Sequence, residues 1–298
     1  MEKTNQKLYQ KLTYKVGDLL PLPTTVSELI KLANNPNVTS RDIGKIIERD
    51  QAMASKILRL ANSASYGFSQ RIRTISHAIV CLGFNKVKSL ALTVSTLKML
   101  SDSLAKYNLD AGALYKHSLA VAVAANIIAE KTKAKDPEEV YLMGLLHDIG
   151  KLIINTHTTN ELEDVWTYYK THKDIKFFQA EKAVFGFDHA DIGGEAARGW
   201  NLPNELCNAI GYHHTPHSAP GDNRCAFIIH LADGIAKTID IGKGLSSDQS
   251  IAVELEGTFK ERNLEVINLK NEDIMGIREQ VSIKLHEVID ELDNNEDS

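Results

Sequence analysis

The 298-residue sequence has no hydrophobic run long enough to span a bilayer. Its most apolar uncharged stretch, residues 118–129, is about half the ~20 residues that a membrane-spanning helix needs. Residues 1–11 are polar and lack the apolar core and the cleavage site of a secretory signal. We therefore expect a cytoplasmic protein that has no membrane partner.

Cysteine is also scarce. Cys81, Cys207 and Cys225 are odd in number and widely spaced, which fits neither a disulfide framework nor a zinc knuckle, so we expect small buried side chains. Two-residue alternation of apolar and polar positions is nearly absent, and the chain has no internal repeat. The hydrophobic share of 43% and the charged share of 24% exclude disordered, collagen-like and coiled-coil proteins.

Apolar residues instead recur at intervals of three and four, for example over residues 43–60, 114–128 and 274–292. Asp136 and Pro137 begin a helix, because Pro is favoured at the first helical position. We therefore predict an all-α, two-lobed fold with a helical C-terminal extension. The predicted parts are a polar tail (1–17), an N-terminal lobe (18–108), a second lobe with the candidate site (109–242) and an acidic extension (243–298).

Charge is distributed unevenly along the chain. Residues 38–98 carry ten Lys and Arg against three Asp and Glu, whereas residues 243–298 carry six against fourteen. Basic residues at helical spacing usually form a solvated face, and aromatic residues are sparse among them, so we do not expect a nucleic-acid partner. The last helix, from about Asn271, is expected to pack on the second lobe, with homodimerisation as the alternative.

His147 and Asp148 stand out because they follow the apolar run 141–146, which places both side chains at a buried helix end. An unpaired carboxylate there would be costly. Neighbouring residues of a helix point about 100° apart, so this pair can flank one cation, or the carboxylate can bridge two. Lys151 follows at a spacing that puts it on the same face, where it could neutralise a bound phosphate.

Other histidines and carboxylates share a position on an apolar helix face or at a helix end. His117 lies on the apolar stripe of its helix, and His189 follows Asp188, which the pattern predicts to be an N-cap. Each of them taken alone is typical of an ordinary buried residue. The full set of such candidates is His117, His189, His213, His214 and Asp233, with His213 and His214 expected to close the helix that begins at Pro203.

The order of these residues along the chain resembles the metal-ligand series of the HD superfamily of phosphohydrolases. That order is His117, His147-Asp148, His189, His213-His214 and Asp233. The HD-GYP branch of that superfamily implies that all seven residues form a carboxylate-bridged metal centre. It also implies that Lys151 contacts a substrate phosphate, which makes Lys151 and Asp148 the catalytic candidates. Imidazole and carboxylate ligands suit a divalent transition metal, and we expect iron, with manganese, zinc and nickel as alternatives and one or two ions.

The sequence departs from the HD-GYP pattern at two places. Thr215-Pro216-His217 follows the paired histidines where that branch carries a Glu-Arg and a Gly-Tyr-Pro motif around a cyclic dinucleotide. Ala113 stands where three-metal members supply a Glu. We therefore expect a substrate or ligand other than cyclic-di-GMP.

Residues 18–237 resemble more closely the HDOD domain, the HD-related output domain of bacterial signalling proteins. Its marks are Leu-Pro-Leu-Pro at 20–23, the motifs at 46–50 and 57–64, and Trp-Asn-Leu-Pro at 200–203. Gln51 is a small departure, because the family usually has Pro there. The resemblance implies a regulatory protein that binds signalling proteins or a nucleotide-like ligand. The alternative is a metal-dependent phosphohydrolase acting on a nucleotide-like phosphoester, since the HD ligands are retained.

Overall fold

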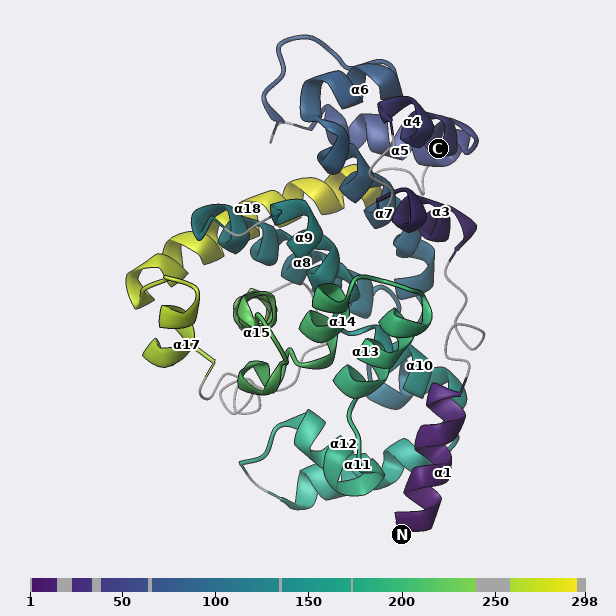
Figure 1. The fold of residues 1–298 in the computed structure, drawn as a ribbon, viewed down its shortest axis with the longest axis vertical. Coiled ribbons are helices and arrows are strands. Elements are labelled where there is room, and N and C mark those ends of the chain that lie inside the picture. Colours follow the sequence, from purple (N-terminus) through teal and green to yellow (C-terminus); the bar gives the residue numbers. More distant parts are fainter. Residues whose placement is uncertain are drawn as a thin grey trace. The chain divides into compact units, whose positions relative to one another are not determined.

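The computed structural model describes residues 2–14, 23–33, 39–63, 66–133, 136–172, 174–239 and 258–293. These residues form helices joined by short turns, and they contain no strand beyond one isolated antiparallel bridge between Leu104 and Leu109 (Figure 1). The predicted all-α fold is confirmed. None of the described helices combines the length and the hydropathy that a membrane crossing requires.

The chain forms two compact units. The first contains Met1–Pro21 and Leu100–Arg278, and the second contains Leu22–Met99 and Glu279–Ser298. The predicted boundaries at 17/18 and 242/243 lie outside the described residues. The predicted division after residue 108 stays a prediction.

Helix α8 (Ala113–Lys131) is the centre of the first unit. All of its residues from His117 to Ala129 are buried. It packs against α9 (Pro137–Leu146) and α15 (Arg224–Lys237). The contact with α9 is very close, because a Cβ added to Gly144 would lie 2.8 Å from the Cα of Ala122.

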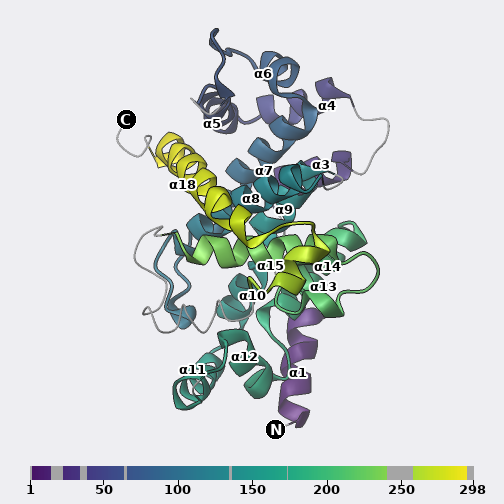
Figure 2. The ribbon, with the colours of Figure 1, turned by 90° about the vertical axis from the view of Figure 1, so that its left-hand side faces the viewer.

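The other helices of the first unit surround this core. Helix α13 packs on α10 and α14, and α11 packs on α12. The N-terminal helix α1 contacts α10, α12 and α13, and lies beside α12 in both views (Figures 1 and 2). The bounds of these helices are α1 Glu2–Thr13, α10 Ile149–His157, α11 Glu161–Thr171, α12 Phe177–Phe185, α13 His189–Gly199, α14 Asn204–Gly211 and α17 Glu261–Val266, with 3-10 turns η2 Ala105–Tyr107 and η3 Pro216–Ser218.

Local capping signals read from the sequence are confirmed. The Asp136 side chain accepts a hydrogen bond from the Glu138 amide at 3.0 Å, with Pro137 at the first position of α9. Asp188 caps α13 in the same way. One expectation was wrong: α14 ends at Gly211, so His213 and His214 follow this helix rather than close it.

The second unit contains five complete or nearly complete helices among its described residues. Helix α4 packs against α3, α5 and α6, and the predicted apolar positions Ile43, Ile47 and Ile57 are fully buried. The Asn62 side chain, at the end of α5, holds the backbone of Ile72 by accepting from its amide at 2.7 Å and donating to its carbonyl at 2.8 Å. The bounds are α3 Thr24–Ala33, α4 Ser40–Glu48, α5 Gln51–Ala61, α6 Ile75–Leu82 and α7 Phe84–Leu100.

The last helix, α18, spans Asn271–Asp293, as its apolar stripe predicted. Its residues Ile277, Val281, Leu285 and Leu292 are buried. The first part of α18 belongs to the first unit, where the Arg278 guanidinium donates to the carbonyl of Thr238 at 2.9 Å.

Candidate metal centre

His147 and Asp148 lie in the turn between α9 and α10. Since α9 ends at Leu146 and α10 begins at Ile149, the pair lies at a helix end, as the sequence predicted, and it separates two helices. Both side chains are buried, with 0% and 1% of the residue exposed. Nδ1 of His147 lies 2.8 Å from the carbonyl oxygen of Gly144, to which it donates.

The carboxylate of Asp148 lies between two groups of histidines. Its Oδ2 is 3.4 Å from Nε2 of His147 and 3.7 Å from Nε2 of His117. Its Oδ1 is 3.2 Å from Nε2 of His189 and 3.9 Å from Nε2 of His213. Each carboxylate oxygen therefore faces a different pair of imidazole nitrogens, which is the arrangement that a bridging ligand of two cations requires.

We name the two groups site A and site B. Within each of the triads His117–His147–Asp148 and His189–His213–His214, the potential ligand atoms lie within 4.8 Å of one another. Oδ1 of Asp233 adds to the first triad at 3.1 Å from Nε2 of His117. Site A comprises His117, His147, Asp148 and Asp233, and site B comprises Asp148, His189, His213 and His214. The structure thus brings together all seven predicted ligands, whose role as metal ligands stays a prediction.

The tautomers of three histidines are fixed from outside the two sites. Nδ1 of His213 donates to the Ile210 carbonyl at 2.7 Å, and Nδ1 of His189 lies 2.5 Å from Oε2 of Glu181. With Nδ1 of His147 also donating, Nε2 of His147 and of His213 is the lone-pair nitrogen that binds metals, and Nε2 of His189 becomes one when that ring gives up its second proton. Nε2 of His147 and of His213 is buried and has no hydrogen-bond partner within the described part of the chain. This donor set fits a transition metal.

Two lysines pair with the carboxylates. Nζ of Lys151 lies 2.6 Å from Oδ2 of Asp148, and Nζ of Lys237 lies 2.8 Å from Oδ2 of Asp233. Burial opposes ionisation of both carboxylates, but the neighbouring histidine and lysine charges outweigh it and hold the pKa of both Asp148 and Asp233 well below the ordinary 3.8. Both carboxylates are therefore ionised at neutral pH.

The histidines differ in their protonation. Burial lowers the pKa of His117, and it lowers the pKa of His213 and His214 well below the ordinary 6.5, so these rings are neutral as metal ligands must be. Burial acts in the same direction on His189, but the negative charge of Glu181 outweighs it and raises the pKa of His189 to about 10.

The sequence interpretation missed four residues that pair with the candidate ligands or with their partners: Tyr107, Glu181, His230 and Lys237. Nδ1 of His230 lies 2.7 Å from the carbonyl oxygen of His213, to which it donates. A signal existed for two of them. Glu181 has the helical spacing of the buried Phe178 and Phe185, which places a carboxylate on an apolar face. Lys237 follows Asp233 by four residues on one helix. No sequence pattern indicated the others.

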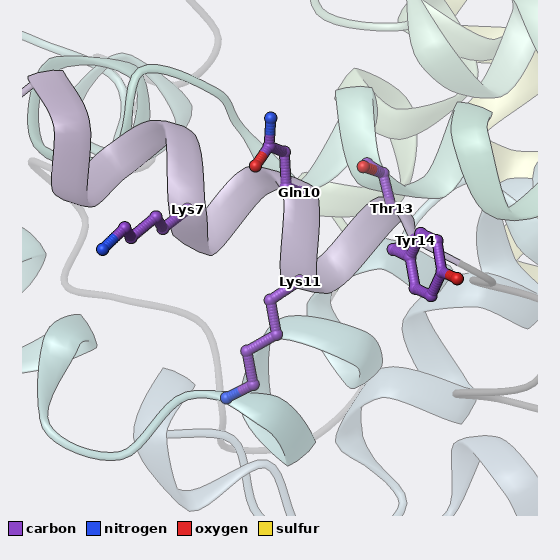
Figure 3. A pocket seen from close by; sticks show the side chains of 5 residues that line it. All are labelled: Lys7, Gln10, Lys11, Thr13 and Tyr14. Atoms are coloured by element: carbon purple, nitrogen blue, oxygen red, sulfur yellow. The ribbon is translucent and has the colours of Figure 1, made fainter.

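A surface hollow on the first unit lies apart from the predicted ligands. Figure 3 shows the side chains that line it, all of them on or just after α1. The ammonium of Lys11 donates to the carbonyl of His157 at 2.9 Å, which ties α1 to the end of α10. The lining residues are Lys7, Gln10, Lys11, Thr13 and Tyr14, and none of them is a candidate metal ligand.

Comparison with solved structures identifies proteins of the same fold. An HDOD domain protein of unknown function from Geobacter sulfurreducens matches with a TM-score of 0.75 and 25% identity, over 98% of this chain and 99% of that chain. A protein provisionally named a phosphohydrolase, from Shewanella amazonensis SB2B, matches with a TM-score of 0.69 and 24% identity, over 96% and 97% of the two chains. A protein provisionally named for signal transduction, from Marinobacter aquaeolei VT8, matches with a TM-score of 0.65 and 22% identity, over 96% and 66%.

The chain spans less than half the length of the curated relatives it matches, 41% of one and 31% of the other. The sequence profile of the HDOD domain matches residues 19–216, about two thirds of the chain. This match covers the Leu22–Met99 part of the second unit and all of the candidate ligands except Asp233. The chain belongs to the HDOD domain family.

Proposed function

We propose that this HDOD protein is a signalling component whose first unit holds a metal centre of two ions. In this proposal it relays a signal by binding a protein partner or a nucleotide-like ligand. The observation that carries the metal centre is the placement of the Asp148 carboxylate between two groups of buried imidazoles, with Nε2 distances of 3.2–3.9 Å.

We propose iron as the metal, with manganese, zinc and nickel as alternatives. Five imidazoles and two carboxylates suit these ions, whereas Mg²⁺ and Ca²⁺ prefer oxygen ligands. In site A the ligands would be His117, His147, Asp148 and Asp233, and in site B Asp148 would join the remaining three histidines. When bound, such ions supply Lewis acidity toward phosphate oxygens.

The region after the paired histidines favours the regulatory role. Residues 216–218 form the 3-10 turn η3, and Nε2 of His217 lies 3.0 Å from Oδ1 of Asn263. This turn occupies the chain position at which the HD-GYP branch carries its dinucleotide motif. Turnover requires groups that hold a phosphorus atom in line with a nucleophile, and that branch supplies them from the motif that η3 replaces here, so binding without turnover is the expected outcome. The name of the Marinobacter neighbour agrees with a signalling role.

A second candidate function is metal-dependent hydrolysis of a nucleotide-like phosphoester other than cyclic-di-GMP. The observation that favours it is the pair Lys151 and Lys237, whose side chains are 18% and 15% exposed beside the buried carboxylates. Ammonium groups at this place would attract a phosphate that approaches the two sites. The name of the Shewanella neighbour agrees with this reading.

Elemental analysis of the purified full chain, followed by assays with the metal restored, tests both functions. We expect two transition-metal ions per chain in the wild type, strong depletion in His147→Ala and no change in His172→Ala, because His172 is exposed. Equal metal in all three proteins would contradict the metal centre. None of the nucleotides, phosphomonoesters or cyclic-di-GMP should be hydrolysed, whether or not it binds. Hydrolysis that His147→Ala abolishes would instead favour the phosphohydrolase.

A further inference from the structure

Glu181 on α12 is a fully buried carboxylate, with 0% of the residue exposed. Its Oε2 lies 2.5 Å from Nδ1 of His189 and accepts from the His189 amide at 3.1 Å. Its Oε1 accepts from the hydroxyl of Tyr107 at 2.6 Å. Both carboxylate oxygens therefore accept hydrogen bonds, and Oε2 accepts from both the ring and the amide of His189, the first residue of α13.

We propose that Glu181 is a positioning residue of the metal centre, which orients His189 and gives site B its second negative charge. The inference rests on the proposed function, because it requires that the cluster binds metal. Glu181 contacts no candidate metal position itself. It acts through His189, whose opposite nitrogen, Nε2, lies 3.2 Å from Oδ1 of Asp148.

The two sites differ in charge, which explains why site B needs such a residue. Site A has two carboxylates among its candidate ligands, Asp148 and Asp233, whereas site B has only the shared Asp148. A buried divalent ion held by one shared carboxylate and neutral imidazoles would keep uncompensated charge, which is costly in a dry interior. A carboxylate behind a ligating histidine makes the ring more basic and offsets that charge.

Tyr107 in turn forms a hydrogen bond to Glu181. It belongs to η2, is 5% exposed and donates its hydroxyl to the oxygen of Glu181 that His189 does not use. This bond holds the Glu181 carboxylate in one orientation. Replacing Tyr107 by Phe leaves the Glu181–His189 contact in place, so its effect should have the same direction as loss of Glu181 and a smaller size.

The alternative is that Glu181 only links α12 to the start of α13. In that case its removal would lower the stability of the metal-free protein without discriminating between the two ions. Asp188 already caps α13 through the Asp191 amide at 2.9 Å, so the helix start does not depend on Glu181 alone. Selective loss of one ion separates a positioning role from a structural one.

The experiment is a Co²⁺ titration of the metal-free full chain, read by visible absorption and by elemental analysis after gel filtration. We expect two ions in the wild type. Glu181→Gln should keep one ion and bind the second roughly 10–100-fold more weakly, and Tyr107→Phe should weaken the same ion less than Glu181→Gln does. Asp233→Asn should weaken the other ion, with a different change in the absorption spectrum.

Glu138→Gln is the matched control. Glu138 accepts from the Asn126 side chain at 3.1 Å near the start of α9, more than two helical turns before His147, so both ions should bind as in the wild type. Urea unfolding of each metal-free variant verifies folding. If Glu181→Gln does not fold, the ion affinities of Tyr107→Phe test the inference. Unchanged affinities for both ions in Tyr107→Phe would contradict it.

The outcomes separate the two proposals. A wild-type chain that binds fewer than two ions contradicts the two-ion centre, and the inference with it. Two ions in the wild type with unchanged affinities in Glu181→Gln contradict the inference and leave the metal centre standing. Equal weakening of both ions by Glu181→Gln also contradicts it, because that result is typical of a structural defect.

Discussion

Asp148→Asn should uncouple the thermal stability of the protein from metal. Among the described residues, Asp148 is the carboxylate that faces both groups of histidines, with two imidazole nitrogens within 3.9 Å of each oxygen. Asn keeps the size of the side chain but removes the charge and one of the two acceptor oxygens. Neither site then retains a shared anionic ligand.

The size of the effect follows from linkage. An ion that binds only the folded state at a free concentration of 100 times its Kd stabilises that state by about 2.7 kcal/mol, so two ions contribute roughly 5 kcal/mol. The first unit has about 200 residues, and in a domain of that size 1 kcal/mol shifts Tm by about 2–4 °C. Chelation should therefore lower the Tm of the wild type by about 10–20 °C.

Differential scanning calorimetry with and without a chelator measures this shift. Asp148→Asn should show a chelator-dependent change below about 2 °C, while Asp164→Asn, an exposed carboxylate on α11, should respond as the wild type does. A full chelator-dependent shift in Asp148→Asn would refute the assignment of the bridging carboxylate. Absence of any shift in the wild type would refute the metal centre itself.

The same variant should be less stable than the wild type even without metal. Removing one partner of a buried ion pair costs about 3–5 kcal/mol, and the carboxylate pairs with Lys151 at 2.6 Å. Because the pKa of Asp148 is held below the ordinary 3.8, its stabilising contribution is complete above that pH and is lost as the pH falls further below it. Urea unfolding at pH 7 should therefore show the whole difference, and equal stability there would contradict the ion pair.

Three further predictions concern packing and the loops. Asn62→Ala should lower the free energy of unfolding by about 2–3 kcal/mol, because the backbone groups of Ile72 lose their partners; a loss under about 0.5 kcal/mol in urea would count against this. Gly150→Ala should cost about 3 kcal/mol or more, or prevent folding, because the added Cβ would lie 1.8 Å from the carbonyl oxygen of His189; wild-type Tm would contradict this contact. Thiol labelling of the native protein should modify the partly exposed Cys81 first. Cys207 and Cys225 are buried, and burial raises the pKa of both thiols. Equal labelling rates for all three cysteines would be inconsistent with the fold.

The helices could be predicted from the sequence because their signals are local. The three- and four-residue spacing of apolar positions and the caps Asp136 and Asp188 involve neighbours within one or two turns. The ends of helices were harder to predict. Helix α14 illustrates this, because it ends at Gly211, before the paired histidines that were expected to close it.

The candidate ligands could be identified only as a set of residue types in a familiar order. They come from α8, the α9–α10 turn, α13, the residues after α14, and α15, and nothing local states how far apart these elements lie. Their distances depend on close helix approaches, such as that of α10 and α13 at Gly150. Glu181 shows the same limit: its spacing marks a carboxylate on an apolar helix face, but its role depends on Tyr107 and His189.

The charges of the cluster also bear on what the protein binds. Without any ion the buried charges are near balance, because the negative groups Asp148, Asp233 and Glu181 face the positive groups Lys151, Lys237 and protonated His189. Two divalent ions add more positive charge than release of the His189 proton removes. Uncompensated charge in a buried site is unfavourable, so an ion-loaded centre favours an anionic ligand near the two partly exposed lysines. A nucleotide-like phosphate, the ligand class proposed above, has that charge.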